Sequence, residues 1–351
     1  LENEQPLITK FLDKIPPFPL DISIAAYYLK EEKIPYDEYL RYISEPKREV
    51  ASIHKFILSD MGHYTKTRYD VISLPVKRIL KIHPDFKDLL LLVSMIGSQN
   101  ITKELLSGYK DSVIVSKFIH ELRKCSLITE KPLNQLEPAF SIHRSTQTIT
   151  LEYLIKLLEL EQGAKQIRSI ASVLVDFMDK GLKKHTDNTP ILVSHVEAFL
   201  GHDSLIDKLT ASNLKARLGI YYFYIGNYVK ARELLEEAYS VYKNYYGLDH
   251  VQTASVATRL GNVYRNIGDY YKAKELLEKA LLIYENHYGK QHNRTARVYI
   301  YLGSIYRNIG DYAKAKNLLE NGLRIYQNNY GNDHIDTARA QAYLGSNDKN
   351  I

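Results

Sequence analysis

A repeat of 42 residues constrains the last third of the chain more than any other feature of the sequence. It is marked by Leu-Gly pairs, which stand at Leu218-Gly219, Leu260-Gly261, Leu302-Gly303 and Leu344-Gly345. Within the second unit, apolar residues fall at helical spacing in two runs, from Val256 to Ile267 and from Ala273 to Tyr284. One hairpin of this size cannot bury its apolar faces alone, so the repeat predicts helical hairpins that stack into a solenoid.

The junction between the two helices of a unit has its own signature. The segment Asn266-Ile267-Gly268-Asp269 places a glycine where the first helix can end in a left-handed residue, followed by an aspartate that can cap the next helix. Gly261 has no side chain, and Ala273 and Ala280 have small ones. We therefore expect the paired helices to approach each other closely.

These residues resemble the tetratricopeptide repeat. The pattern runs Leu260-Gly261, Tyr264, Gly268, Ala273, Ala280. The 42-residue form, with Tyr-Gly-x-x-His in the linking loop, is similar to the repeats of kinesin light chains and related bacterial proteins. The resemblance covers about residues 210 to 346 and implies an α-solenoid that binds proteins or peptides. Because the fourth copy stops soon after Gly345, we expect the chain to be part of a longer protein.

The resemblance also implies where a partner binds, because in this family the first helix of each hairpin lines the concave face. The predicted partner-binding residues are Asn262, Arg265, Asn266, Arg297, Ser304, Arg307, Asn308 and Arg339. A groove of arginines and asparagines can hold the backbone amides and carboxylates of an extended acidic peptide. The alternative is that these side chains are solvated faces of repeats whose partner binds elsewhere.

The first two hundred residues predict a mainly α fold with one short sheet. Helices are expected over 21–32, 36–43, 71–82, 89–96, 102–109, 112–124, 151–161, 167–182 and 190–200. Strands are expected over 126–129 and 140–143, and helices followed by a two-stranded wing describe a winged helix. The predicted domains are a helical segment over 1–64, a winged helix over 65–150, a helical linker over 151–210 and the repeats over 211–351.

This order of domains resembles the carboxy-terminal part of signalling NTPases of the STAND class, which carry an NB-ARC-type nucleotide-binding domain. Pro19-Leu20 stands where that family has a Gly-Leu-Pro-Leu motif, and Ile142-His143-Arg144 is similar to its Met-His-Asp motif. The resemblance implies that Pro19 packs on adenine and that His143 contacts the β-phosphate of ADP. The sequence has no phosphate-binding loop, so we expect no enzyme activity from this chain alone and ADP or ATP only in a full-length protein.

Cysteine content and hydropathy exclude other classes of function. A single cysteine, Cys125, allows no internal disulfide, and the sequence has no Cys/His cluster with metal-ligand spacing. No apolar stretch is long enough to cross a bilayer, so we expect a soluble cytoplasmic protein. The recurrent His250, His292 and His334 stand on successive hairpins, roughly 10 Å apart, which is too far for one metal ion.

Two functions remain. The first is the regulatory region of a nucleotide-switched NTPase, in which the repeats capture a protein and the winged helix transmits that event. The alternative is a DNA-binding regulator that uses Lys117, Arg123 and Lys124 on the last helix of the winged helix. The net charge of +6 is mild for a nucleic-acid-binding protein, and Glu121 interrupts the basic run, so the first function is favoured.

Overall fold

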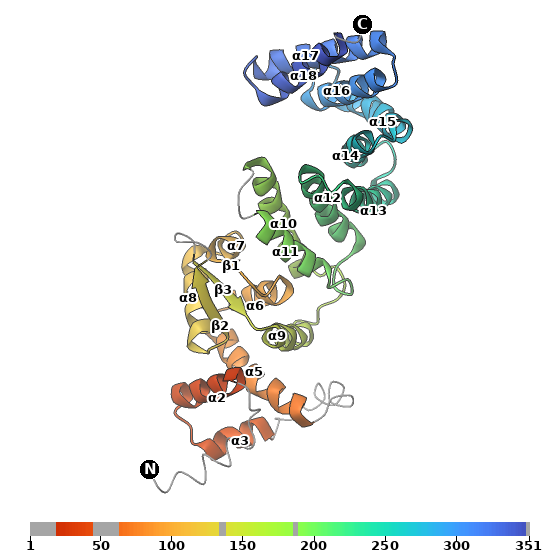
Figure 1. The fold of residues 1–351 in the computed structure, drawn as a ribbon. Coiled ribbons are helices and arrows are strands. Elements are labelled where there is room, and N and C mark those ends of the chain that lie inside the picture. Colours follow the sequence, from red (N-terminus) through yellow and green to blue (C-terminus); the bar gives the residue numbers. More distant parts are fainter. Residues whose placement is uncertain (1–18, 45–62, 133–137, 185–188, 349–351) are drawn as a thin grey trace. The chain divides into compact units, whose positions relative to one another are not determined.

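The computed structural model describes residues 19–44, 63–132, 138–184 and 189–348. The chain divides into two compact units, Leu1–Asp207 and Lys208–Ile351, and each is described by itself (Figure 1). Both units are mainly helical, which confirms the predicted fold class at that level.

In the described part of the first unit, helices stand at both ends of a middle region that contains a small sheet. These helices are α2 (Pro19–Glu32), α3 (Tyr36–Ser44), α5 (His63–Ile82), α10 (Lys165–Lys184) and α11 (Thr189–Leu200). α5 packs against both α2 and α3, and α10 packs against α11. α5 begins before residue 71, where the sequence predicted its start, and continues through Pro75.

The middle of the first unit alternates helices with strands. Its elements are α6 (Phe86–Met95), β1 (Ile101–Thr102), α7 (Lys103–Ser107), α8 (Ser112–Lys124), β2 (Ile128–Pro132), β3 (Pro138–Ile142) and α9 (Arg144–Leu157). The sheet is antiparallel and β3 lies in its centre, where Phe140 pairs with Ile101 of β1 and with Glu130 of β2. The two predicted strands are present as β2 and β3 with shifted bounds, whereas β1 was missed, because its two residues are too few to form an alternating pattern.

Helix α6 supplies the core of this region and is buried from Leu89 to Met95. The buried Gln147 of α9 donates from Nε2 to the backbone oxygens of Val93 at 2.7 Å and Ile96 at 2.9 Å. These two bonds satisfy carbonyls at the end of α6 that have no partner within the helix. Gln147 therefore joins α9 to α6 in the interior.

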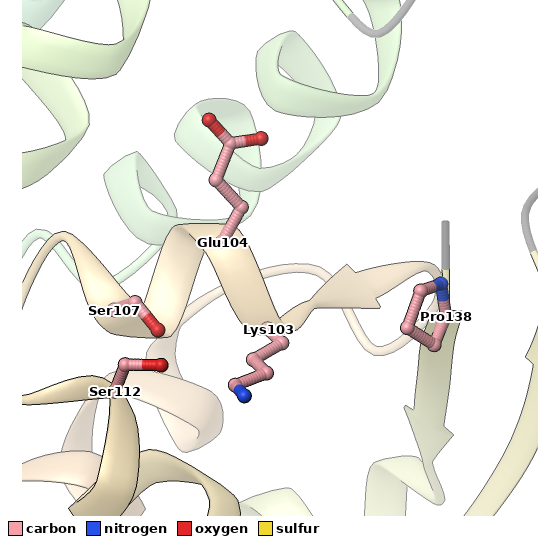
Figure 2. Close-up of a pocket in the computed structure, with 5 residues that line it drawn as sticks. All are labelled: Lys103, Glu104, Ser107, Ser112 and Pro138. Atoms are coloured by element: carbon pink, nitrogen blue, oxygen red, sulfur yellow. The ribbon is translucent and has the colours of Figure 1, made fainter. Parts of the chain in front are cut away.

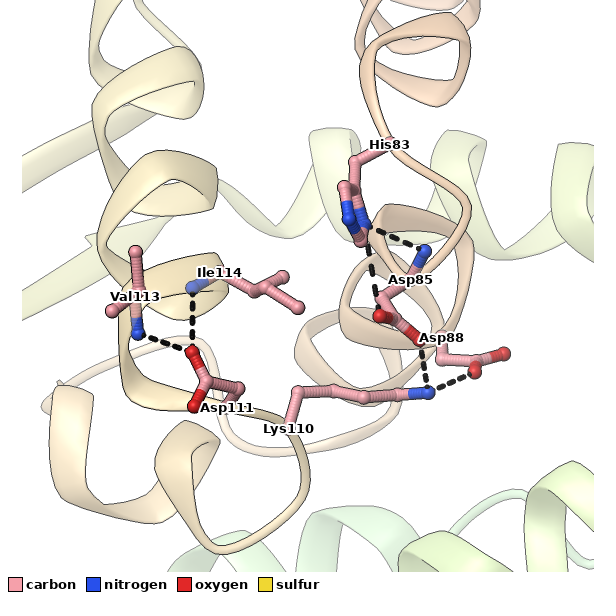
Figure 3. Close-up of polar contacts among 7 residues, drawn as sticks. All are labelled: His83, Asp85, Asp88, Lys110, Asp111, Val113 and Ile114. Atoms are coloured by element: carbon pink, nitrogen blue, oxygen red, sulfur yellow. Dashed lines mark hydrogen bonds and ion pairs between the residues drawn. The ribbon is translucent and has the colours of Figure 1, made fainter.

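An ion cluster ties the loop before α8 to the start of α6 (Figure 3). Lys110 Nζ donates to Asp85 Oδ1 and to Asp88 Oδ2, each at 2.6 Å. The hydrogen bond from Lys110 holds the pKa of the Asp85 carboxyl below its ordinary value. Asp111, the next residue, caps α8 by accepting from the amide N–H of Val113 at 2.8 Å. One short loop thus fixes the starts of two helices.

The second unit is a stack of helical hairpins. Its helices are α12 (Lys208–Tyr224), α13 (Tyr228–Tyr246), α14 (Val251–Ile267), α15 (Tyr270–Tyr288), α16 (Asn293–Asn308), α17 (Tyr312–Tyr330) and α18 (Ile335–Asp348). Consecutive helices pack against each other along the whole series, as Figure 1 shows for this part of the chain. The two helices predicted for each repeat are therefore confirmed.

The turn within each hairpin has the predicted chemistry. Gly268 ends α14 with a φ of +86°, a left-handed conformation that favours glycine. Asp269 caps α15, because its side chain accepts from the amide N–H of Lys272 at 3.2 Å. Asp311 caps α17 in the same way, accepting from Lys314 at 3.1 Å.

The paired helices touch where the sequence has its Leu-Gly pairs. A Cβ placed on Gly261 would lie 2.8 Å from Cγ of Leu277, which is fully buried on the partner helix. The corresponding distance is 2.7 Å for Gly219 against Leu235, and for Gly303 against Leu319. This contact confirms the predicted close approach and repeats in three hairpins.

Tyrosine hydroxyls join one hairpin to the next. Tyr264 of α14 donates to the carboxylate of Glu236 in α13, and Tyr306 of α16 donates to Glu278 in α15 at 2.9 Å. Lys314 Nζ also donates to the Tyr306 hydroxyl, at 2.7 Å. Phenylalanine could fill the same space but could not make these bonds, which accounts for part of the excess of 29 Tyr over 9 Phe.

We expect Gly261→Ala to lower the free energy of unfolding by about 1–3 kcal/mol, because the new methyl group overlaps Leu277 and the hairpin must open. Gly345→Ala is the matched control, since a Cβ there meets nothing within 4 Å. The control should be neutral or should gain up to about 1 kcal/mol from helix propensity. Urea unfolding of the full chain followed by circular dichroism measures both, and equal effects would contradict the role of the contact.

We expect Lys110→Met to cost about 1 kcal/mol of unfolding free energy near neutral pH, because it removes two ion pairs and leaves two carboxylates side by side. Asp85 has a lowered pKa, so its contribution is complete above its unfolded pKa of about 3.9 and is lost as the pH falls through the folded value. The difference between wild type and variant should therefore shrink in acid. Lys117→Met, at an exposed position of α8, is the control and should change little at either pH.

Candidate functional site

The first helices of the hairpins form the inside of the stack. α12 contacts α14, α14 contacts α16, and α16 contacts α18, in addition to the contacts each makes with its neighbours in sequence. Within the described part of the second unit, the second helices α13, α15 and α17 do not pack on one another to this extent. The stack therefore curves toward its first helices, and we call the surface of α12, α14, α16 and α18 the inner face.

The two layers differ in their acidic residues, while both carry cations: helices α13, α15 and α17 contain 9 Lys and Arg. Helices α12, α14 and α16 contain 8 Lys and Arg and no Asp or Glu. Helices α13, α15 and α17 contain 7 Glu. The basic character predicted for the concave face is thus a property of the whole layer, and an anionic segment would meet no acidic side chain on these three inner helices.

Arg265 is the most firmly held of the predicted partner-binding residues. Its Nε and Nη2 donate to Asn262 Oδ1 at 3.0 and 2.9 Å, and its Nη1 donates to Ser304 Oγ at 3.0 Å. Asn262 and Ser304 are buried, so they position the Arg265 guanidinium and present little polar surface of their own. Asn266, which is exposed, donates from Nδ2 to the backbone oxygen of Asn262 at 2.7 Å.

Aromatic rings flank the arginines of the inner face. The Arg265 guanidinium lies 5.5 Å from the ring centroids of both Tyr301 and Tyr343. Arg307 lies 5.7 Å from the Tyr343 ring, and its Nη2 donates to Asn308 Oδ1 at 3.3 Å. Cations in contact with aromatic faces keep their hydrogen atoms available for a ligand, so this pattern fixes the arginines without neutralising them.

Arg297 and Arg339 occupy the same position in successive repeats but have different surroundings. Burial acts to lower the pKa of Arg297, but the neighbouring Tyr301 and Tyr326 outweigh burial and raise it. Arg339 is exposed and pairs through Nη1 with Asp336 Oδ1 at 3.3 Å. The cation at position 339 is therefore already compensated by a carboxylate.

Sequence reasoning missed Arg259 and Tyr301. They stand at one position of the repeat, in the series Arg217, Arg259, Tyr301 and Tyr343. Burial and the positive charge of Arg297 lower the pKa of Arg259. Among the described residues, no carboxylate lies within ion-pair distance of Arg259. Two signals in the sequence could have found them: the 42-residue series itself, and the absence of Asp and Glu from the segments that form α12, α14 and α16.

The two residues predicted to contact a nucleotide lie in the first unit. Pro19 is the first residue of α2. His143 is exposed and caps α9, because its Nδ1 accepts the amide N–H of Ser145 at 3.2 Å. Both α2 and α9 pack against α5, so one helix supports both positions.

A pocket of about 410 Å³ opens beside α7 and the start of α8 (Figure 2). It is lined by Lys103, Glu104, Ser107, Ser112 and Pro138. Figure 2 shows the Lys103 ammonium and both serine hydroxyls turned toward the same space, whereas the Glu104 carboxylate points away. Neither residue of the predicted nucleotide site lines this pocket.

The basic residues of α8 are largely paired within the unit. Arg123 forms an ion pair with Glu130 of β2, and Lys124 Nζ lies 3.4 Å from Glu121 Oε1. Of the three cations considered for DNA contact, Lys117 alone is exposed without such a carboxylate among the described residues. Phosphate contacts would have to compete with these ion pairs.

The three recurrent histidines are helix caps. His250, His292 and His334 each accept, at Nδ1, the amide N–H two residues ahead, at 3.1, 3.1 and 3.2 Å. Each ring also stacks on a tyrosine four residues earlier, with ring centroids 4.2 to 4.7 Å apart. In the parts of the chain that the structure describes, no group of three His, Cys, Asp or Glu side chains could hold a metal ion.

The repeats match a known family. The tetratricopeptide repeat model matches residues 209–286, 252–328 and 295–348. Residues 209–348 are therefore tetratricopeptide repeats, which confirms that part of the predicted resemblance and supports protein–protein interaction. None of the curated proteins compared with the chain matches it. Among the described residues, no helix is both long and apolar enough to span a bilayer.

Several solved structures are similar to this chain. BtubC, also named BKLC, from P. vanneervenii has 23% identity and a TM-score of 0.42, over 53% of this chain and 74% of that one. A Podospora anserina protein named as a kinesin light chain with nearly identical TPR-like repeats has 18% identity and a TM-score of 0.44, over 53% and 88%. A STAND protein with a tetratricopeptide repeat sensor from Pyrococcus horikoshii has 13% identity and a TM-score of 0.28, over 94% and 63%.

We expect His292→Asn to reduce the dependence of stability on pH. Burial and the Arg294 cation lower the pKa of His292, so its cap contributes fully above its unfolded pKa of about 6.5 and is lost as the pH falls through the folded value. Asparagine caps without titrating, so the loss of unfolding free energy between about pH 7 and pH 5 should shrink by up to about 1 kcal/mol. His120→Asn, on the exposed side of α8, is the control. If the unfolding free energy of His292→Asn depends on pH as steeply as that of the wild type, His292 is not the titrating cap.

Proposed function

We propose that this chain is the partner-binding and regulatory region of a nucleotide-switched NTPase in the cytoplasm. Its repeats bind a peptide segment of another protein on the inner face, and the chain acts by binding, not by catalysis. The observation that carries this proposal is the basic, acid-free surface of α12, α14 and α16. Arg265 and Arg307, which are held in place but not neutralised, are the expected contacts.

We further propose that residues 65–150 form a winged helix that transmits the binding event. The order α6, β1, α7, α8, β2, β3, with β3 central in the sheet, supports this assignment. Transmission through protein contacts is favoured over DNA binding, because Arg123 and Lys124 are engaged in ion pairs.

A nucleotide would bind to the full-length protein, with Pro19 and His143 among its contacts. His143 fits the role, because Nδ1 accepts an amide N–H and the ring proton therefore sits on Nε2, which can donate to a phosphate oxygen. The reading frame upstream of Leu1 tests this part of the proposal. A phosphate-binding loop within the preceding few hundred residues supports the switch, and its absence from a complete upstream sequence would overturn it.

Peptide selection tests the binding function. Random peptides displayed on phage are selected against the full chain, and the enriched peptides are then titrated against wild type and the Arg265→Ala/Arg307→Ala double variant. We expect affinity to fall at least tenfold in the double variant, because each arginine removes charge-assisted hydrogen bonds.

The control is Lys279→Ala/Arg324→Ala, which removes two cations from the second helices α15 and α17. It should retain wild-type affinity. Peptides that bind the double variant as tightly as the wild type would place the binding site away from the inner face, and a failure to enrich any peptide would count against peptide binding altogether.

A further inference from the structure

Three arginines lie near one tyrosine on the inner face, and the guanidinium of one of them, Arg265, is 5.5 Å from the centroid of the Tyr301 ring. Arg259, Arg265 and Arg297 all act electrostatically on the Tyr301 hydroxyl, although burial outweighs them and raises its pKa. Arg259 and Arg265 come from α14, whereas Arg297 and Tyr301 come from α16, and the two helices are in contact. We call these four residues the arginine cluster.

Among the residues that the structure describes, no carboxylate forms an ion pair with an arginine of the cluster. The carboxylate that acts on it is Asp336 of α18, and that carboxylate already pairs with Arg339. Arg259 is half-buried, and the positive charge of Arg297 adds to the cost of keeping it ionised. Bringing cations together in a partly desolvated place is unfavourable unless an anion binds there.

The arginine cluster also contains hydrogen-bond donors that have no acceptor in the part of the chain that the structure describes. Among the described residues, neither the Arg259 guanidinium nor the Tyr301 hydroxyl has a hydrogen-bond partner. Both groups nevertheless retain contact with solvent, since neither contributes a buried polar atom that lacks a partner. Arg265 donates one N–H to each of its three contacts. Its two terminal nitrogens, Nη1 and Nη2, each have a second N–H that can donate to a ligand.

We propose that the arginine cluster is a subsite for a phosphoryl group carried by the bound peptide. A carboxylate would bring one negative charge to three cations, whereas a phosphorylated side chain brings about −1.5 to −2 and three acceptor oxygens. Those oxygens can accept from Arg259, Arg265 and the Tyr301 hydroxyl together, in the way that planar guanidinium groups recognise phosphate. This subsite rests on the proposed peptide-binding function and adds a requirement for phosphorylation to it.

Fluorescence polarisation with defined peptide pools tests the subsite. Three fluorescein-labelled pools share random flanking positions and differ at one fixed central residue, which is phosphoserine, glutamate or serine. We expect the phosphoserine pool to bind the full chain at least tenfold more tightly than either of the others. Arg259→Gln should remove at least tenfold of that affinity, because it deletes one charge-assisted contact.

Two variants distinguish a loss of specific contacts in the subsite from a loss of net positive charge. Arg324→Gln removes the same charge from α17, a second helix outside the inner face, and should change the affinity of the phosphoserine pool by less than about twofold. Tyr301→Phe keeps the ring on which Arg265 lies and deletes only the hydroxyl, so it should give a smaller loss than Arg259→Gln.

Several outcomes would overturn the subsite. Equal affinity for the phosphoserine and glutamate pools would mean that one carboxylate suffices, and equal losses in Arg259→Gln and Arg324→Gln would reduce the effect to net charge. If all three pools bind alike and still require Arg265 and Arg307, the phosphoryl subsite is wrong while peptide binding on the inner face stands. If no pool binds, the subsite is also wrong, and the phage selection decides the wider function.

Discussion

The contact between a glycine of one helix and a leucine of its partner sets the geometry of the repeats. At Gly261 the helices are so close that a single methyl group would overlap Leu277, and the same fit recurs in the hairpins before and after. Because every hairpin has this same narrow spacing, each presents similar surfaces to its neighbours. The repeated tyrosine–glutamate bonds, such as Tyr306 with Glu278, can therefore form between successive hairpins.

In the repeats, different side chains serve to join the hairpins and to form the inner face. Glu236 and Glu278 of the second helices accept from tyrosines of the next hairpin, so these two acidic residues help to join the stack. On the first helices, two cations are oriented by neutral groups: Arg265 by Asn262 and Ser304, and Arg307 by the Tyr343 ring. An inner face built in this way keeps its positive charge while its side chains remain ordered.

The sequence predicted those features that depend on local chemistry and regular spacing. The left-handed Gly268, the Asp269 cap and the close approach at Gly261 each follow from one residue's own properties in a periodic pattern. Features that depend on residues distant in sequence were missed. β1 has two residues and exists only because Phe140 of β3 pairs with it. The importance of position 259 depends on a cation 38 residues away, at Arg297, which no local pattern reports.

Because the tyrosine–glutamate bonds between hairpins recur every 42 residues, the stack can lose a whole repeat and still close. If 42 residues were lost from the middle of the stack, Glu236 would meet Tyr306 in place of Tyr264, and the same type of bond would close the gap. The inner face would not survive in the same way, because Arg217 would then be followed by Tyr301 without Arg259 between them. Gain or loss of whole repeats can thus preserve folding and alter the ligand in a single genetic step.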